Sequence, residues 1–91
     1  MEKMYRVAGP SSYTTGGFTV SLTDFKTVNK AVVVGENLDG NMVIQYSISG
    51  NTLTVKVFTL SYSTASGITA TEVSAGTDLS SYYFNIVAEG L

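Results

Sequence analysis

The feature that most constrains the fold is the step Gly50-Asn51 in the segment SISGNTLTV, residues 47–55. On both sides of it every second residue is apolar, which is the periodicity of half-buried β-strands. Gly and Asn tolerate positive φ, so the step predicts a β-hairpin with a type II′ or type I′ turn. A two-residue loop also fixes the register. The predicted facing pairs are Ile48–Leu53, Tyr46–Val55 and Ile44–Val57.

A second turn signal, Asp39-Gly40, lies just before this hairpin and is typical of type I′ turns. A turn centred there would place the apolar run 31–35 beside the strand 42–48. The predicted facing pairs are Leu38–Asn41, Gly35–Ile44, Val33–Tyr46 and Ala31–Ile48. Residues 31–62 are therefore predicted to form a three-stranded antiparallel meander. After Val57 the apolar positions change phase, which predicts either a β-bulge or a strand that crosses between two sheets.

Other short stretches also read as strands, and no segment requires a helix. These strands are predicted around residues 4–8, 18–22, 68–73 and 82–87. Six or seven short strands separated by turn signals predict an all-β fold, either a single antiparallel β-sandwich or a small barrel. The predicted core residues are Phe18, Val20, Leu22, Val33, Ile44, Tyr46, Ile48, Leu53, Val55, Val57, Phe84 and Ile86.

Residues 1–91 are expected to form a single β-domain, because this length suits one hydrophobic core. Residues 1–16 are expected to be an N-terminal arm or an edge strand. The apolar positions of 4–8 favour a sheet, whereas Gly9-Pro10 and the small polar run 11–17 separate them from the next strand. We expect this arm to contribute to contacts between subunits of a homo-oligomer.

Charge and composition limit the classes of partner. Charged residues make up only 13% of the chain, and the net charge is −2. The few Lys and Arg residues are scattered, so no basic surface for nucleic acid is indicated. There is also no basic amphipathic segment and no apolar run of the ~18 residues that a membrane span needs. We therefore expect neither nucleic acid nor a membrane among the partners.

Catalysis is not expected either. The chain has no His and no Cys, and acid–base catalysis without them would need a desolvated pair of carboxyl groups, which no spacing predicts. Most of the acidic residues fall in predicted turns or at strand ends, where carboxylates are solvated. They are Glu2, Asp24, Glu36, Asp39, Glu72, Asp78 and Glu89. The sequence predicts a non-enzymatic protein without a cofactor.

Two groups of residues are candidate binding sites. The segment GENLDGN, residues 35–41, offers oxygen ligands that suit a hard cation such as Ca²⁺, but turn chemistry accounts for every residue in it. We therefore predict no metal site. The tyrosines could stack on sugars, but core or subunit-interface positions are the favoured interpretation. They are Tyr5, Tyr13, Tyr46, Tyr62, Tyr82 and Tyr83.

Three segments carry a resemblance to a known kind of domain: FTVSLTDFKTVNKAVVVGEN, GNTLTVKVFTLSYS and YYFNIVAEGL. In this order they resemble the small β-sandwich domains of phage tail fibres and other virion proteins, including those of the H-type lectin kind. Phe25 matches the first aromatic, 31–34 the apolar strand, 53–58 the second motif and 88–90 the Ala-x-Gly ending. No sugar-binding residue is carried over by the resemblance.

The resemblance implies a non-enzymatic structural protein of a virion, as a capsid-associated, decoration or fibre subunit that acts through self-assembly. Copies of the chain and other virion proteins would be its partners. The alternatives are a lectin-like module that binds glycans and a filament subunit that exchanges a terminal strand. The beginning MEKMYRVAGP lacks the apolar segment of a signal peptide. Synthesis in a host cytoplasm and a location in the virion are therefore expected.

Overall fold

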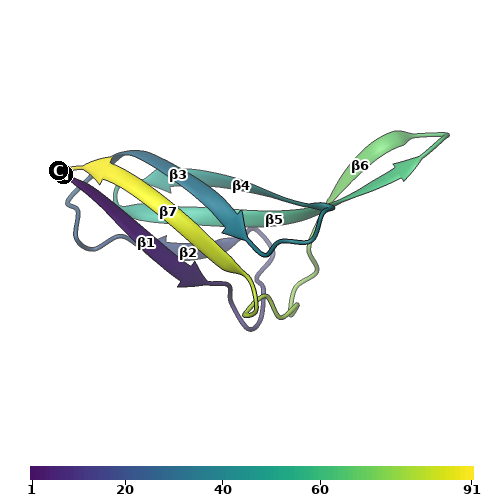
Figure 1. Cartoon of the computed structure of the whole chain (residues 1–91), viewed down its shortest axis with the longest axis horizontal. Coiled ribbons are helices and arrows are strands. Elements are labelled where there is room, and N and C mark those ends of the chain that lie inside the picture. Colours follow the sequence, from purple (N-terminus) through teal and green to yellow (C-terminus); the bar gives the residue numbers. More distant parts are fainter.

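The computed structural model describes residues 1–91 and consists of strands, turns and loops (Figure 1). The strands are β1 Glu2–Ala8, β2 Phe18–Ser21, β3 Val28–Glu36, β4 Met42–Ser49, β5 Thr52–Ser63, β6 Gly67–Glu72 and β7 Tyr83–Gly90. They form two antiparallel sheets that pack face to face, as predicted for a β-sandwich. Sheet A has the order β1-β7-β3, and sheet B has the order β2-β5-β4 with β6 paired to β5. No helix has the length and apolar character needed to cross a membrane.

The hairpin at Gly50-Asn51 is confirmed in its turn and its register. β4 and β5 pair through Ile48–Leu53, and the ladder continues without a shift to Met42–Thr59. Gly50 has a φ of 62°, whereas Asn51 is not in the positive-φ region. Positive φ at the first turn position alone is the pattern of a type II′ turn.

Gly50→Val is expected to destabilise the domain by roughly 1 kcal/mol or more, because a β-branched side chain is strained at positive φ. A Cβ at this position meets no atom within 4 Å, so the loss comes from backbone strain and not from a clash. Chemical denaturation of the two proteins measures it. The matched control is Ser49→Val in the adjoining strand residue, which should be nearly neutral. Equal losses in the two variants would contradict the argument.

The predicted meander is wrong in its first pair of strands, because β3 does not pair with β4. β3 belongs to sheet A and pairs with β7, so that Val33 faces Ile86 and Gly35 faces Phe84. A tight turn does form after Asp39, whose carbonyl accepts a hydrogen bond from the Met42 amide at 2.9 Å. Asn37, with a φ of 63°, redirects the chain before that turn. The segment between β3 and β4 is therefore a crossover between the two sheets and not a hairpin.

The phase change after Val57 is not explained by a bulge or by a crossing strand. β5 runs without a register shift from Thr52 to Ser63, and its last half pairs with β6 (Figure 1). Up to Val57 the apolar residues of β5 point into the core. The core ends there, and the apolar residues that follow lie on the opposite side of the strand. Beyond this point β5 leaves the sandwich as one arm of a second hairpin. The weak strand predicted at 68–73 is confirmed as the other arm, β6.

The core lies between the two sheets, and most of the predicted residues belong to it. Leu22, Val33, Leu53, Val55, Val57, Phe84 and Ile86 are buried, while Phe18, Val20, Ile44 and Ile48 are partly buried against them. Tyr46 was wrongly assigned to the core, because it lies on the edge strand β4 and is 37% exposed. The core residues not predicted are Tyr13, Phe25, Val28, Leu79 and Ala88.

The N-terminal segment folds back on its own chain. β1 is an edge strand of sheet A and pairs with β7 from Glu2–Glu89 to Ala8–Tyr83. The polar run 11–17 does not separate β1 from the rest of the fold, because Tyr13 within this run is buried in the core and is 1% exposed. The Tyr13 amide also donates to the Thr77 carbonyl at 2.8 Å, which joins this run to the loop after β6. A role of the arm in contacts between subunits stays a prediction.

Candidate functional site

The most distinctive surface is the β5–β6 hairpin, which projects beyond the end of the sandwich (Figure 1). The molecule measures 48 × 24 × 21 Å, and its radius of gyration is 14.2 Å. A compact domain of this length would have a radius of gyration of about 12 Å. The projection begins beyond Thr59, which pairs with Met42, the first residue of β4. From there on no strand accompanies β5 on the β4 side. We call residues 58–71 the hairpin arm.

The two faces of the hairpin arm differ in chemistry. Facing residues of an antiparallel pair lie on the same side of the ribbon, so the register assigns each side chain to a face. One face carries Phe58, Leu60, Tyr62, Ile68 and Ala70, and at its base Phe58 lies between Val43 of β4 and Glu72 of β6. The other face carries Thr59, Ser61, Thr69 and Thr71. We call the first set the apolar face of the hairpin arm.

The outer end of the apolar face lacks a partner within the chain, whereas Phe58 and Leu60 nearer the sandwich are half-buried. Tyr62 is 72% exposed and Ile68 is 71% exposed. Residues 57–71 contain no charged side chain and no Pro, which are the usual protections of an exposed strand edge. An isolated two-stranded ribbon is only marginally stable in water. The arm therefore has the properties of a surface that a partner covers.

A buried tyrosine fixes the base of the hairpin arm to the sandwich. The Tyr13 hydroxyl donates to Glu72 Oε2 at 2.6 Å and accepts from the Val57 amide at 3.2 Å. The Gly16 amide also donates to Glu72 Oε2, at 2.9 Å. Val57 lies between the part of β5 that pairs with β2 and the part that pairs with β6. Its amide therefore has no strand partner, and the Tyr13 hydroxyl takes that place. Burial, together with the Glu72 hydrogen bond, raises the pKa of Tyr13 to about 12.

A second apolar surface lies on the outer side of sheet A. Met4, Val87 and Val32 face one another across the three strands, and Val34 follows Val32 on the same side of β3. Their exposed fractions run from 38% for Val87 to 75% for Met4. We call these four residues the sheet A patch. An apolar row across a whole sheet face is unusual for a surface that only water contacts.

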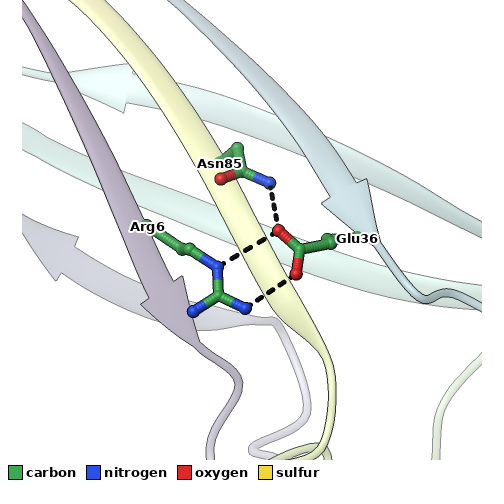
Figure 2. A network of polar contacts seen from close by, with 3 residues as sticks. All are labelled: Arg6, Glu36 and Asn85. Carbon is green, nitrogen blue, oxygen red and sulfur yellow. Dashed lines mark hydrogen bonds and ion pairs between the residues drawn. The ribbon is translucent and has the colours of Figure 1, made fainter.

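Polar contacts beside the sheet A patch hold the three strands together (Figure 2). Arg6 of β1 reaches across β7 to Glu36 of β3, with its Nε and Nη2 donating to the two carboxylate oxygens at 3.1 and 2.7 Å. The guanidinium carbon lies 3.6 Å from the centre of the Tyr83 ring. Asn85 donates to the same carboxylate at 3.1 Å. The Arg6 and Asn85 hydrogen bonds lower the pKa of Glu36 to about 2.

Glu36 and Asp39 of the segment 35–41 contact different partners. Glu36 belongs to the Arg6 contact, whereas Asp39 accepts a hydrogen bond from the Tyr82 hydroxyl at 3.0 Å. Asp39 lines an open groove of about 410 Å³ at the base of the hairpin arm. Further polar residues of this groove are Asn41, Thr59, Thr71, Glu72, Ser74, Thr77, Asp78 and Tyr82.

Two other acidic side chains, Asp24 and Asp78, also have local partners. Asp24 accepts from Tyr5 at 2.8 Å and pairs with Lys3 at 3.0 Å, and these contacts lower its pKa. Asp78 accepts from the amide and the hydroxyl of Ser80, which lowers its pKa too. None of these contacts joins one carboxyl group to another. These carboxylates thus stabilise loops and strands by accepting hydrogen bonds.

Sequence reasoning missed the hairpin arm and the sheet A patch. It predicted the strand at 68–73 but not its pairing with β5, which places the apolar positions of the two strands on one face. The signal was present in the sequence, because the uncharged run 57–71 alternates apolar with Ser and Thr on both sides of Gly67. No protein-family model matches the chain, and comparison with curated proteins and with solved structures gives no significant match.

Proposed function

We propose that the protein is a non-enzymatic structural subunit that acts by self-assembly, of the kind found in virions as a decoration or fibre subunit. The observation that carries the proposal is the hairpin arm, an uncharged projection on which Tyr62 and Ile68, at the outer end of the apolar face, have no partner within the chain. Maintaining such a projection in a monomer exposes aggregation-prone edges, whereas an assembly buries them. The sequence resemblance to virion β-sandwich domains supports the same proposal.

The engagement of the acidic side chains favours a structural role over catalysis. Glu36, Glu72 and Asp24 each accept hydrogen bonds that lower their pKa values, as suits groups that stay ionised at neutral pH. A catalytic carboxyl group at neutral pH is usually one whose pKa is raised by burial or by a neighbouring negative charge. The low net charge of −2 also places little repulsion between copies.

One substitution in the hairpin arm tests the proposal. Ile68→Glu places a charge on the apolar face at a side chain that is 71% exposed, so the monomer should keep its fold. We expect the wild-type protein to self-associate and the variant to associate at least about tenfold more weakly, since about 1.4 kcal/mol accounts for each factor of ten. Analytical ultracentrifugation over a concentration series measures this, with circular dichroism as the check on folding.

Thr69→Glu is the matched control, because it adds the same charge one residue away on the Ser/Thr face. It should associate like the wild type. A wild-type protein that stays monomeric at high concentration would overturn the proposal. So would association that Ile68→Glu leaves unchanged.

A second candidate function is glycan binding, which the groove at the base of the hairpin arm favours. The side chains of Asp39, Asn41, Asp78 and Tyr82 line it and combine hydrogen-bonding oxygens with an aromatic ring. Sugar hydroxyl groups need such acceptors, and sugar rings stack on aromatic faces. A glycan array with the wild-type protein separates the two candidates, because a structural subunit without lectin activity binds none of the arrayed sugars.

A further inference from the structure

We infer that the step Asp39-Gly40 is a site of covalent modification, at which the main chain rearranges to isoaspartate through a succinimide without an enzyme. Both residues are exposed and lie in the turn that leads from β3 of sheet A to β4 of sheet B. The reaction needs an aspartate side chain, a following amide nitrogen that is free to attack it, and open space around that nitrogen. It does not depend on whether the chain assembles.

The rearrangement is an isomerisation and needs no reagent other than water. The Gly40 amide nitrogen attacks Cγ of the protonated Asp39 carboxyl group, so that an N–Cγ bond forms, the nitrogen gives up its proton and one carboxyl oxygen leaves as water. The product is a five-membered succinimide ring. Water then opens the ring at either carbonyl. Opening at Cγ restores aspartate, whereas opening at the former main-chain carbonyl gives isoaspartate, with the same mass and charge.

The turn leaves the attacking nitrogen free. The Asp39 carbonyl accepts from the Met42 amide at 2.9 Å, so Gly40 is the second residue of the turn, and its own amide makes no hydrogen bond within the chain. A Cβ at Gly40 would meet no atom within 4 Å, which shows that the space is open. The Asp39 carboxylate accepts only from the Tyr82 hydroxyl, at 3.0 Å. Exposed polar contacts of this kind are weak, so the side chain can leave this one.

The other two aspartates are protected by the fold. Asp24 and Asp78 are followed by Phe25 and Leu79, whose amides donate to backbone carbonyls at 3.0 and 2.8 Å. Phe25 and Leu79 are also 2% exposed, so attack by either nitrogen would require a core residue to move. No Asn in the chain precedes a Gly. The structure therefore singles out Asp39 among the residues that could form a succinimide.

The modification would act on the base of the hairpin arm. Isoaspartate lengthens the main chain by one atom and turns the former Asp39 carbonyl into a free carboxylate. The Met42 amide then loses its turn acceptor, and the Tyr82 hydroxyl loses its partner in the groove. Between these residues the Asn41 carbonyl accepts from the Leu60 amide at 2.7 Å. Ageing of the turn should therefore loosen the attachment of β4 to the hairpin arm.

Storage of the purified protein at neutral pH and physiological temperature tests the inference. Peptide mapping with electron-transfer dissociation locates isoaspartate, and enzymatic methylation of isoaspartyl groups counts it. We expect isoaspartate to accumulate at residue 39 at least about tenfold faster than at residues 24 and 78. A synthetic peptide of residues 37–42 gives the rate without a fold, and the folded protein should react within about tenfold of it. The Met42 and Leu60 amides should exchange hydrogen faster in the aged protein.

Gly40→Ala is the matched variant, because it keeps Asp39 and adds a methyl group next to the attacking nitrogen. Gly40 does not have positive φ, and its surroundings are open, so the variant should fold and be at least as stable as the wild type. Its isoaspartate should form at least about tenfold more slowly. The inference is overturned if residue 39 reacts no faster than residues 24 and 78, if the fold slows the reaction far below that of the peptide, or if Gly40→Ala reacts like the wild type. Unchanged exchange at Met42 and Leu60 would overturn the effect on the hairpin arm.

Discussion

Replacing Phe84 by Ala is expected to destabilise the domain by about 3–5 kcal/mol, the range for removing a buried aromatic ring. Phe84 is fully buried on β7, the central strand of sheet A. Its ring meets that of Phe18 from sheet B edge to face, with the ring centres 5.1 Å apart. The substitution therefore leaves a cavity between the two sheets. A domain of this size has only about 5–14 kcal/mol of stability, so the variant should be largely unfolded on mild heating.

Ile44→Ala provides the comparison for this prediction. Ile44 also points toward the core, but it lies on the edge strand β4 and is only partly buried. Its loss should be about 2 kcal/mol or less, because less apolar surface returns to water. Urea denaturation of the three proteins ranks them. If Ile44→Ala costs as much as Phe84→Ala, the core is centred differently from the packing described above.

Tyr13→Phe is expected to cost about 1–3 kcal/mol, although it removes a single oxygen atom. The ring stays in the core, but the Val57 amide loses its acceptor in a buried place, and an unsatisfied buried donor costs this much. Glu72 also loses its shortest hydrogen bond. The hairpin arm should become more mobile at its base. Hydrogen exchange measured on residues 58–71 should therefore speed up more than exchange in sheet A.

Tyr82→Phe is the control, since it removes a tyrosine hydroxyl whose bond to Asp39 lies on the exposed surface. Its cost should be small, as is usual for solvent-exposed polar contacts. The role given to Tyr13 is wrong if the two variants lose the same stability, or if exchange in the hairpin arm does not change in Tyr13→Phe.

The parts of the fold that follow from local chemistry could be predicted from the sequence. Gly50-Asn51 permits one tight turn, and the alternation on both sides of it agrees with a single register, so β4 and β5 were placed correctly. Asp39-Gly40 is an equally clear turn signal, but the hairpin that it predicts gives β3 the wrong partner strand, β4 in place of β7. Residues 31–34 are apolar on both faces, so they pair as well with β7 as with β4, and nothing local decides between the two.

The candidate surfaces could not be predicted for a related reason. An apolar side chain on a strand belongs to the core or to an interface according to what covers that strand. Val32 and Val33 are alike in sequence, yet only Val33 faces sheet B. Tyr13 and Leu79 lie in segments that read as polar loops, and both are buried. Their burial depends on where β5 and β7 lie in the fold, which local pattern does not encode.

The position of β7 in sheet A has a consequence for how the chain folds during synthesis. β7 lies between β1 and β3, so β1 must wait for β7, and Glu2 pairs with Glu89. On the ribosome the chain can form the β4–β5 hairpin early, but sheet A can close only after residue 90 has emerged. Contacts between such distant residues make folding slow, on the order of milliseconds to seconds. Until then the uncharged hairpin arm and the unpaired β1 and β3 are exposed together, which makes the emergence of β7 the step that protects the chain from premature association.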